Sequence, residues 1–218
     1  MRHISILIIL ILTVSTGFAQ SFDGIDVSHH QGKINWSKVQ KSCPNLKFVY
    51  VKATEGKTYV DPRYEENVKG ARKAGFKVGV YHFFRMTSGA REQFANLNAA
   101  IAKVGIDLIP MVDVETSDKH SVHEVKDSLR VFVNLVKEMY GVDPMIYGTN
   151  RSYNELCAPD FNHLLMYIGR YGENRPVVKG PSHYYIWQYS EKGSIDGIPK
   201  PVDLCRFHKD ADVSKIDY

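Results

Sequence analysis

Short apolar runs alternate with amphipathic segments along the first two thirds of this chain. Apolar runs of six to eight residues between turn-forming residues are typical of buried strands. Longer segments with a helical period are typical of helices packed on one face. The sequence predicts strands over 22–27, 46–53, 77–84, 108–114 and 144–149. It predicts helices between them, over 36–41, from 61 to about 75, and over 90–104, 122–140 and 152–157.

Several helix ends carry local stop and start signals. Asn35 is expected to cap the first helix, because an Asn side chain accepts a free backbone N–H there. Asp61-Pro62 predicts a helix start with a side-chain cap and a proline at the first position. Ser121 and Glu124 form a capping box before the longest helix, and Gly141 ends it.

The last third has a different pattern. Strands are predicted over 164–170, 184–189 and 202–207, and the segments between them are rich in Gly and Pro without a helical period. Eight strands, of which the first five alternate with helices, favour an α/β fold of the modified TIM type: a closed barrel whose last three strands lack crossover helices. A doubly wound open sheet is the competing fold. It would usually keep helices in this region and often a Gly-rich phosphate loop, and neither is visible.

The N-terminus predicts export. Arg2 and His3 precede an apolar run over 6–14, and small residues follow up to Ala19. This is the pattern of a signal peptide over 1–19, which leaves a single barrel domain over 20–218. The apolar run is short for a membrane span, and no later stretch is apolar enough. We therefore expect a periplasmic or extracellular protein without an integral membrane segment.

Composition narrows the possible partners and cofactors. The formal net charge is +4 and no basic run would follow a nucleic acid, so we expect no nucleic-acid partner. The three cysteines, Cys43, Cys157 and Cys205, have no CxxC spacing. They predict small buried side chains with at most one disulfide, and no zinc or redox site.

The strongest chemical signal is MVDVE at 111–115. Asp113 and Glu115 are two residues apart, so in an extended chain they share a face with Cα atoms about 6.6 Å apart. Two neighbouring acids repel and lose hydration, which raises at least one pKa, and a carboxyl protonated near neutrality suits a general acid. The alternative is a strand that simply ends in a polar loop.

Other predicted strand ends carry polar and aromatic residues as well. In a β/α barrel, reactive residues lie at the C-terminal ends of strands. Acids and aromatics gathered at one rim indicate a sugar-binding groove. The residues at these ends are Asp26, His29, His30, Lys52, Glu55, Tyr81, His82, Asp113, Glu115, Tyr147, Asn150, Trp187, Gln188, Tyr189 and Asp203.

Several motifs together resemble the family-25 glycoside hydrolases, lysozymes that cut peptidoglycan. They are GIDVSHHQG (24–32), FVYVKATEG (48–56), NVKGARKAGFKVGVYHFF (67–84), MVDVE (111–115), MIYGT (145–149), IWQYS (186–190) and VDL (202–204). The resemblance spans nearly the whole exported chain and implies a barrel of eight strands and five helices. One departure is LLMYIGRY at 164–171, where the family often has a Trp in the sixth strand.

The resemblance also implies an activity and a set of site residues. The activity would be hydrolysis of the β-1,4 bond from N-acetylmuramic acid to N-acetylglucosamine, by a monomer without cofactor or metal. Glu115 would be the general acid and Asp113 the adjacent stabilising carboxylate, with Asp26 and Asp203 as further catalytic acids. Substrate contacts are expected from Tyr81, Tyr147, Trp187 and Gln188. Attack by the sugar's own 2-acetamido group, with retention of configuration, is favoured over attack or water activation by a second carboxylate.

Two other functions stay open on the sequence. One is a glycan-binding barrel without catalysis. The other is a metal-dependent wall deacetylase that uses Asp26, His29 or His30 with His82. Lys52 and Glu55 are interpreted as a structural ion pair at the rim rather than as substrate contacts.

Overall fold

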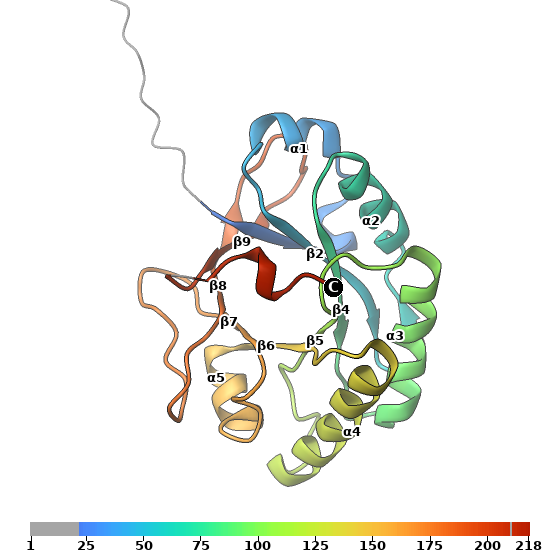
Figure 1. Cartoon of the computed structure of the whole chain (residues 1–218), viewed down its shortest axis with the longest axis vertical. Helices are drawn as coiled ribbons and strands as arrows, with labels where there is room; N and C mark the ends of the chain where they lie inside the picture. The colour runs from blue at the N-terminus through green and yellow to red at the C-terminus, as the bar shows by residue number, and fades with distance from the viewer. Residues whose placement is uncertain (1–21, 210) are drawn as a thin grey trace, which may run out of the picture.

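The protein forms one closed barrel of eight strands, which Figure 1 shows end-on. The computed structural model describes residues 22–209 and 211–218, and the predicted signal peptide lies outside them. The strands are β1 (Gly24–Val27), β2 (Phe48–Glu55), β3 (Tyr59–Val60), β4 (Val78–Phe83), β5 (Met111–Asp113), β6 (Met145–Thr149), β7 (Met166–Gly169), β8 (Ile186–Gly193) and β9 (Val202–Phe207). Around the barrel the order is β1-β9-β8-β7-β6-β5-β4-β2, and pairing of β1 with β2 closes it. The predicted barrel is confirmed, and the open sheet was the wrong alternative.

Five helices lie on the outside of the first part of the barrel (Figure 1). They are α1 (Trp36–Ser42), α2 (Tyr64–Lys73), α3 (Ala90–Val104), α4 (Val122–Tyr140) and the short α5 (Asn150–Ser152), which continues as a single π-helical turn, η2 (Tyr153–Cys157). Each connects consecutive parallel strands, with β3 inserted before α2. Only loops connect β7 to β8 and β8 to β9.

The last strands close the barrel in a different way. β7 and β8 are parallel, but β9 runs antiparallel to both β8 and β1. An antiparallel neighbour needs no helical crossover, which explains the absence of a helix between β8 and β9. The start of β9 therefore lies at the same rim as the ends of the other strands.

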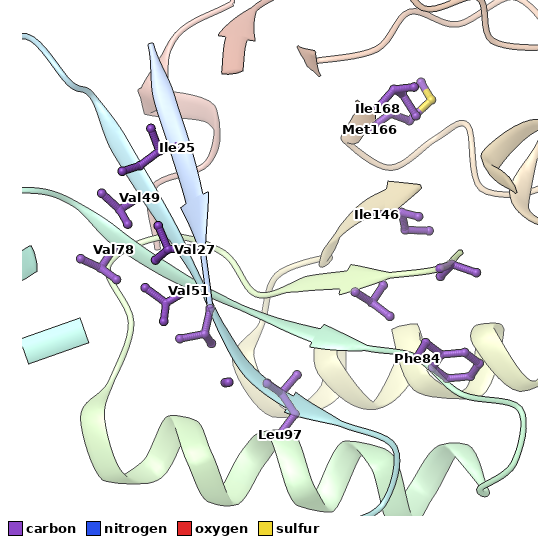
Figure 2. Packing of buried hydrophobic residues seen from close by; sticks show 14 of the residues in the cluster. Ile25, Val27, Val49, Val51, Val78, Phe84, Leu97, Ile146, Met166 and Ile168 are labelled. Carbon is purple, nitrogen blue, oxygen red and sulfur yellow. The ribbon is translucent and has the colours of Figure 1, made fainter. Parts of the chain in front are cut away.

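The core has two layers, because successive side chains of a strand point alternately toward the helices and into the barrel. Val49 and Val51 of β2 face the helix side, where Figure 2 shows them with Ile25, Val27 and Leu97. Phe48 and Tyr50 belong to the interior cluster. Gly79 permits this packing, since a Cβ there would lie 2.4 Å from the ring of Tyr50. By the same alternation, Asp26 between Ile25 and Val27 points into the barrel.

The C-terminal segment closes the barrel at the N-terminal ends of its strands. Ile109 donates a backbone hydrogen bond to Ile216 at 2.8 Å, Leu108 pairs with Asp217, and Ile216 is fully buried in the interior cluster. Figure 1 marks the C-terminus near the centre of the barrel. The opposite end of the barrel remains free for a site.

Three local details differ from the prediction. The Oδ1 atom of Asp61 accepts the backbone N–H of Arg63 at 2.9 Å, as a local cap does, and its Oδ2 atom binds His29, but α2 itself begins only at Tyr64. β5 spans only Met111–Asp113, shorter than the strand predicted over 108–114. The two-residue strand β3, antiparallel to β2, was not predicted.

Candidate active site

A cavity of about 120 Å³ opens at the barrel end where the parallel strands β1, β2 and β4 to β8 terminate. All four predicted acids line it, together with three of the four residues expected to contact substrate. Its lining consists of Asp26, Tyr81, Met111, Asp113, Glu115, Tyr147, Tyr171, Gln188 and Asp203. Trp187 lies outside it and lines the neighbouring cavity. Asp203 reaches this rim from the start of β9, not from a strand end, because β9 runs in the opposite direction.

Asp113 and Glu115 form the first carboxyl pair, at the end of β5. Asp113 is 5% exposed, whereas Glu115 is exposed at the mouth. Burial, then the nearby charge of Glu115, raises the pKa of Asp113 well above its ordinary value. Desolvation, then Asp26, raises the pKa of Glu115, and a hydrogen bond from Asp113 partly offsets this. The pair therefore titrates as a unit that retains a proton above the ordinary range of carboxyl groups.

One atom of this pair is not paired with protein. Among the described residues, the buried Oδ1 atom of Asp113 has no hydrogen-bond partner. A buried polar atom without a partner is costly and marks a site where a ligand or water completes the bonding. Asp113 therefore offers an acceptor position inside the cavity.

Asp26 and Asp203 form the second pair, across the β1–β9 seam. They are directly opposite in the antiparallel register, and Asp26 is 8% exposed. Desolvation, the charge of Asp26 and a hydrogen bond to it raise the pKa of Asp203 to about 9. Asp203 is thus protonated at neutral pH and donates to Asp26.

Asp26 is held by further donors on neighbouring strands. Its Oδ2 atom accepts a hydrogen bond from the Tyr167 hydroxyl at 2.7 Å and from Gln188 Nε2 at 3.0 Å. The Cys205 thiol lies 3.5 Å from the same oxygen. These contacts fix one carboxylate of the cavity in a single orientation.

A hydrogen-bonded chain continues from Asp26 toward β6. The Tyr147 hydroxyl donates to Gln188 Oε1 at 2.7 Å, so the Gln188 amide links Tyr147 to Asp26. Gly169 leaves room for the chain, since a Cβ there would lie 2.6 Å from the Tyr147 hydroxyl. Tyr147 and Gln188 are 6% and 3% exposed, so most of each side chain is packed behind the cavity surface.

Sequence reasoning missed Tyr167, Cys205 and Tyr171 at this site. Tyr167 lies in the LLMYIGRY segment, which was judged only by its lack of a Trp. The period-two alternation along β7 was the available signal, since it turns Tyr167 inward between Met166 and Ile168.

Lys52 and Glu55 form the predicted structural ion pair. Lys52 Nζ lies 2.7 Å from Glu55 Oε2, and the Lys52 side chain is 11% exposed. The charge of Lys52 lowers the pKa values of Asp113 and Glu115, in opposition to their burial. The pair thus contributes to the electrostatics of the cavity without lining it.

Two of the three histidines considered as metal ligands, His29 and His82, have other side-chain partners. His29 Nδ1 lies 2.7 Å from Asp61, and the buried His82 ring contacts Thr54 at 2.8 Å and Gln93 at 3.1 Å. Over 22–209 and 211–218, no group of three or more His, Cys, Asp or Glu side chains is arranged to hold a metal ion.

Two further predictions concern a possible disulfide and membrane-spanning segments. Cys43, Cys157 and Cys205 are all free thiols, so the one allowed disulfide does not form. Within the described part of the chain, no helix has both the length and the apolar character needed to cross a membrane.

Comparisons with known proteins agree with this geometry. The family model described as glycosyl hydrolases family 25 matches residues 25–198. The Escherichia coli protein YegX is 32% identical over 188 residues, which cover 85% of this chain and 69% of YegX. The autolytic lysozyme of Clostridium acetobutylicum is 31% identical, over 84% of this chain and 55% of that protein. The structure of a family 25 glycosyl hydrolase from Bacillus anthracis is 27% identical, has a TM-score of 0.79, and is matched over 87% of this chain and 90% of that one.

Proposed function

This chain belongs to family 25 of the glycosyl hydrolases, and we propose that it is an exported muramidase. Its substrate would be peptidoglycan, and the bond cleaved would be the β-1,4 link between N-acetylmuramic acid and N-acetylglucosamine. The observation that carries the proposal is the meeting of Asp26, Asp113, Glu115 and Asp203 in one cavity at the rim of the barrel.

Glu115 acts as the general acid in this proposal. The pKa values of both Glu115 and Asp113 are raised, so the pair retains a proton when ordinary carboxyl groups are ionised. Glu115 is the exposed member and can reach a glycosidic oxygen at the mouth, whereas Asp113 is buried. Glu115 protonates the leaving oxygen as the bond to the anomeric carbon breaks.

Asp113 stabilises the group that attacks the anomeric carbon. Its Oδ1 atom, without a partner among the described residues, can accept the N–H of the sugar's 2-acetamido group and orient the acetamido oxygen for attack. This substrate-assisted route forms a cyclic intermediate, which water then opens with overall retention of configuration. On the opposite wall, Asp26 and Asp203 offer carboxyl oxygens that can accept hydrogen bonds from the sugar.

Product analysis tests the reaction. Purified peptidoglycan is digested with the mature protein, and the new reducing ends are identified by mass spectrometry. We expect reducing N-acetylmuramic acid, whose anomeric configuration by NMR immediately after cleavage should be retained. Free peptides or reducing N-acetylglucosamine would refute the assignment. Release of acetate with intact glycan strands would indicate a deacetylase, and tight binding without products would indicate a glycan-binding barrel.

Export is tested separately. The full chain is expressed with its N-terminus intact, and the protein outside the cytoplasm is analysed by N-terminal sequencing. A mature start at Gln20 is expected from the predicted cleavage after Ala19. An uncleaved chain retained inside the cell would contradict export without affecting the proposed chemistry.

A further inference from the structure

A second, larger cavity of about 640 Å³ adjoins the acidic one, and the two share Tyr171. It lies between the loop after β7 and the strands β8 and β9. Aromatic and cationic side chains make up much of its lining: Tyr171, Arg175, Trp187, Tyr189, Lys192 and Arg206. The proposed cleavage reaction uses none of these residues.

The wall of this cavity is preformed by hydrogen bonds to β8. Arg170 and Gly172 donate backbone hydrogen bonds to Gln188 at 3.0 Å and Tyr189 at 2.9 Å, on either side of Tyr171. The indole N–H of Trp187 donates to the Arg170 carbonyl at 2.6 Å. The backbone at Tyr171 is therefore held between the two cavities, and a ligand need not order this part of the loop on binding.

The two cavities differ in charge. The acidic cavity is lined by four carboxyl groups and by no Lys or Arg among the described residues. The second has three cations, of which the Arg206 guanidinium lies 4.1 Å from the centroid of the Tyr189 ring. Two acids, Glu173 and Glu191, also line it. A ligand with carboxylates and an amino group can contact exposed cations and acids of this set together.

We infer that the second cavity binds the peptide stem attached to a muramoyl residue of the strand being cleaved. This inference rests on the proposed muramidase function. The lactyl group of muramic acid carries a peptide with free carboxylates and, in many walls, an amino group. A stem leaving a sugar in the acidic cavity passes Tyr171 and meets Arg175 and Lys192, both exposed. The favoured substrate is thus peptide-bearing glycan rather than bare glycan.

Paired substrates test this. Soluble glycan strands are assayed with their peptides and after the peptides have been removed by an amidase. We expect the Arg175→Ala/Lys192→Ala double variant to lower kcat/KM about tenfold on peptide-bearing strands, mainly through KM, as the loss of charged contacts predicts. On stripped strands the change should be less than about twofold. Reversal of both charges, Arg175→Glu/Lys192→Glu, should enlarge only the first effect.

The matched control removes two exposed lysines from the outer helices, Lys41→Ala/Lys103→Ala, and should act like wild type on both substrates. Binding of a muramoyl tripeptide, measured by calorimetry, gives a readout that does not need turnover, and charge reversal should weaken it at least tenfold. Equal losses on both substrates, or unchanged tripeptide affinity, would overturn the inference. If wild type binds the tripeptide but releases no reducing muramic acid, the proposed function fails while the binding site stands.

Discussion

The two carboxyl pairs of the acidic cavity are built in opposite ways. Asp113 and Glu115 are neighbours along the chain at the end of β5, and one of them is exposed at the mouth. Asp26 and Asp203 are 177 residues apart and meet only because β9 runs antiparallel to β1. The first pair has an acceptor atom without a partner among the described residues, whereas the second is tied to Tyr167 and Gln188.

This difference separates two tasks. A pair with one exposed member can exchange a proton with substrate, because the exposed carboxyl can come within hydrogen-bond reach of a bound sugar. A pair bound by donors on neighbouring strands keeps its charge in one place, which costs no reorganisation during the reaction. We therefore expect substitutions in the β5 pair to alter the chemical step, and substitutions at the seam to alter positioning and stability.

The largest expected effect comes from breaking the β5 pair. Glu115→Gln removes the proton donor but keeps the size of the side chain, so kcat should fall by about 10² to 10⁴. The rate of release of reducing ends from peptidoglycan measures this. Glu138→Gln, an exposed residue on the outer face of α4, is the matched control and should keep full activity. A Glu115→Gln protein with near-normal kcat would show that the acid is misassigned.

Replacing Asp203, at the seam between β1 and β9, should change how the free energy of unfolding depends on pH. The pKa of Asp203 is about 9 in the folded protein, against an ordinary value of 3.8. The folded state thus holds a proton that the unfolded chain releases, so the free energy of unfolding falls as pH rises between these two values. Asp203→Asn removes this contribution, so the fall in the free energy of unfolding should become shallower by up to about 1.4 kcal/mol per pH unit.

Denaturant titrations from pH 4 to pH 9 measure this slope. Asp113, whose pKa is also raised, leaves a residual slope of the same sign in the variant. The exposed Asp196→Asn is the control and should keep the wild-type slope. Identical slopes in wild type and Asp203→Asn would mean that the seam pair does not hold an extra proton.

A smaller effect is expected when one donor to Asp26 is removed. Tyr167→Phe deletes the hydroxyl that lies 2.7 Å from Asp26 but keeps the ring, so kcat/KM should fall about tenfold, the usual cost of a hydrogen bond to a charged group. Cys205→Ser retains a donor near the same oxygen and should have little effect on activity. If Tyr167→Phe lowers stability without lowering kcat/KM, the seam has a structural role only.

Features that depend on neighbouring residues could be predicted from the sequence, whereas features that depend on distant strands could not. The bounds of α3 and α4 were predicted correctly because Gly105, Ser121 and Gly141 end or start them through local bonds. Proximity of Asp113 to Glu115 follows from their spacing alone. The pairing of Asp26 with Asp203 depends on the register of two distant strands, which no local pattern encodes.

Asp61 has a local and a distant partner on the same carboxylate. Its Oδ1 atom accepts the backbone N–H of Arg63, as the Asp61-Pro62 pattern predicts. Its Oδ2 atom lies 2.7 Å from Nδ1 of His29, 32 residues earlier, and no local pattern encodes that contact. Likewise, Tyr167 became part of the site through a contact with a residue 141 positions away.

The smallest expected effect is a shift of the pH–activity profile when the charge of Lys52 is removed, and it tests the assignment of the general acid. Lys52 lowers the pKa values of Asp113 and Glu115, although it lies outside the cavity lining. Lys52→Met removes this positive charge, so both pKa values should rise and the general acid should stay protonated to higher pH. The alkaline limb of the kcat/KM profile should therefore move upward by about half a pH unit, as expected for a screened charge near the pair.

Glu55→Gln supplies the opposite change on the same ion pair. Glu55 raises the pKa of Asp113, so its neutralisation should move the alkaline limb to lower pH. Both variants disrupt the Lys52–Glu55 bridge of 2.7 Å, and a purely structural effect would shift both profiles in the same direction or neither. Opposite shifts would instead show that the β5 pair delivers the proton. Neither Lys52 nor Glu55 is among the causes that raise the pKa of Asp203, so the seam pair should respond to neither charge.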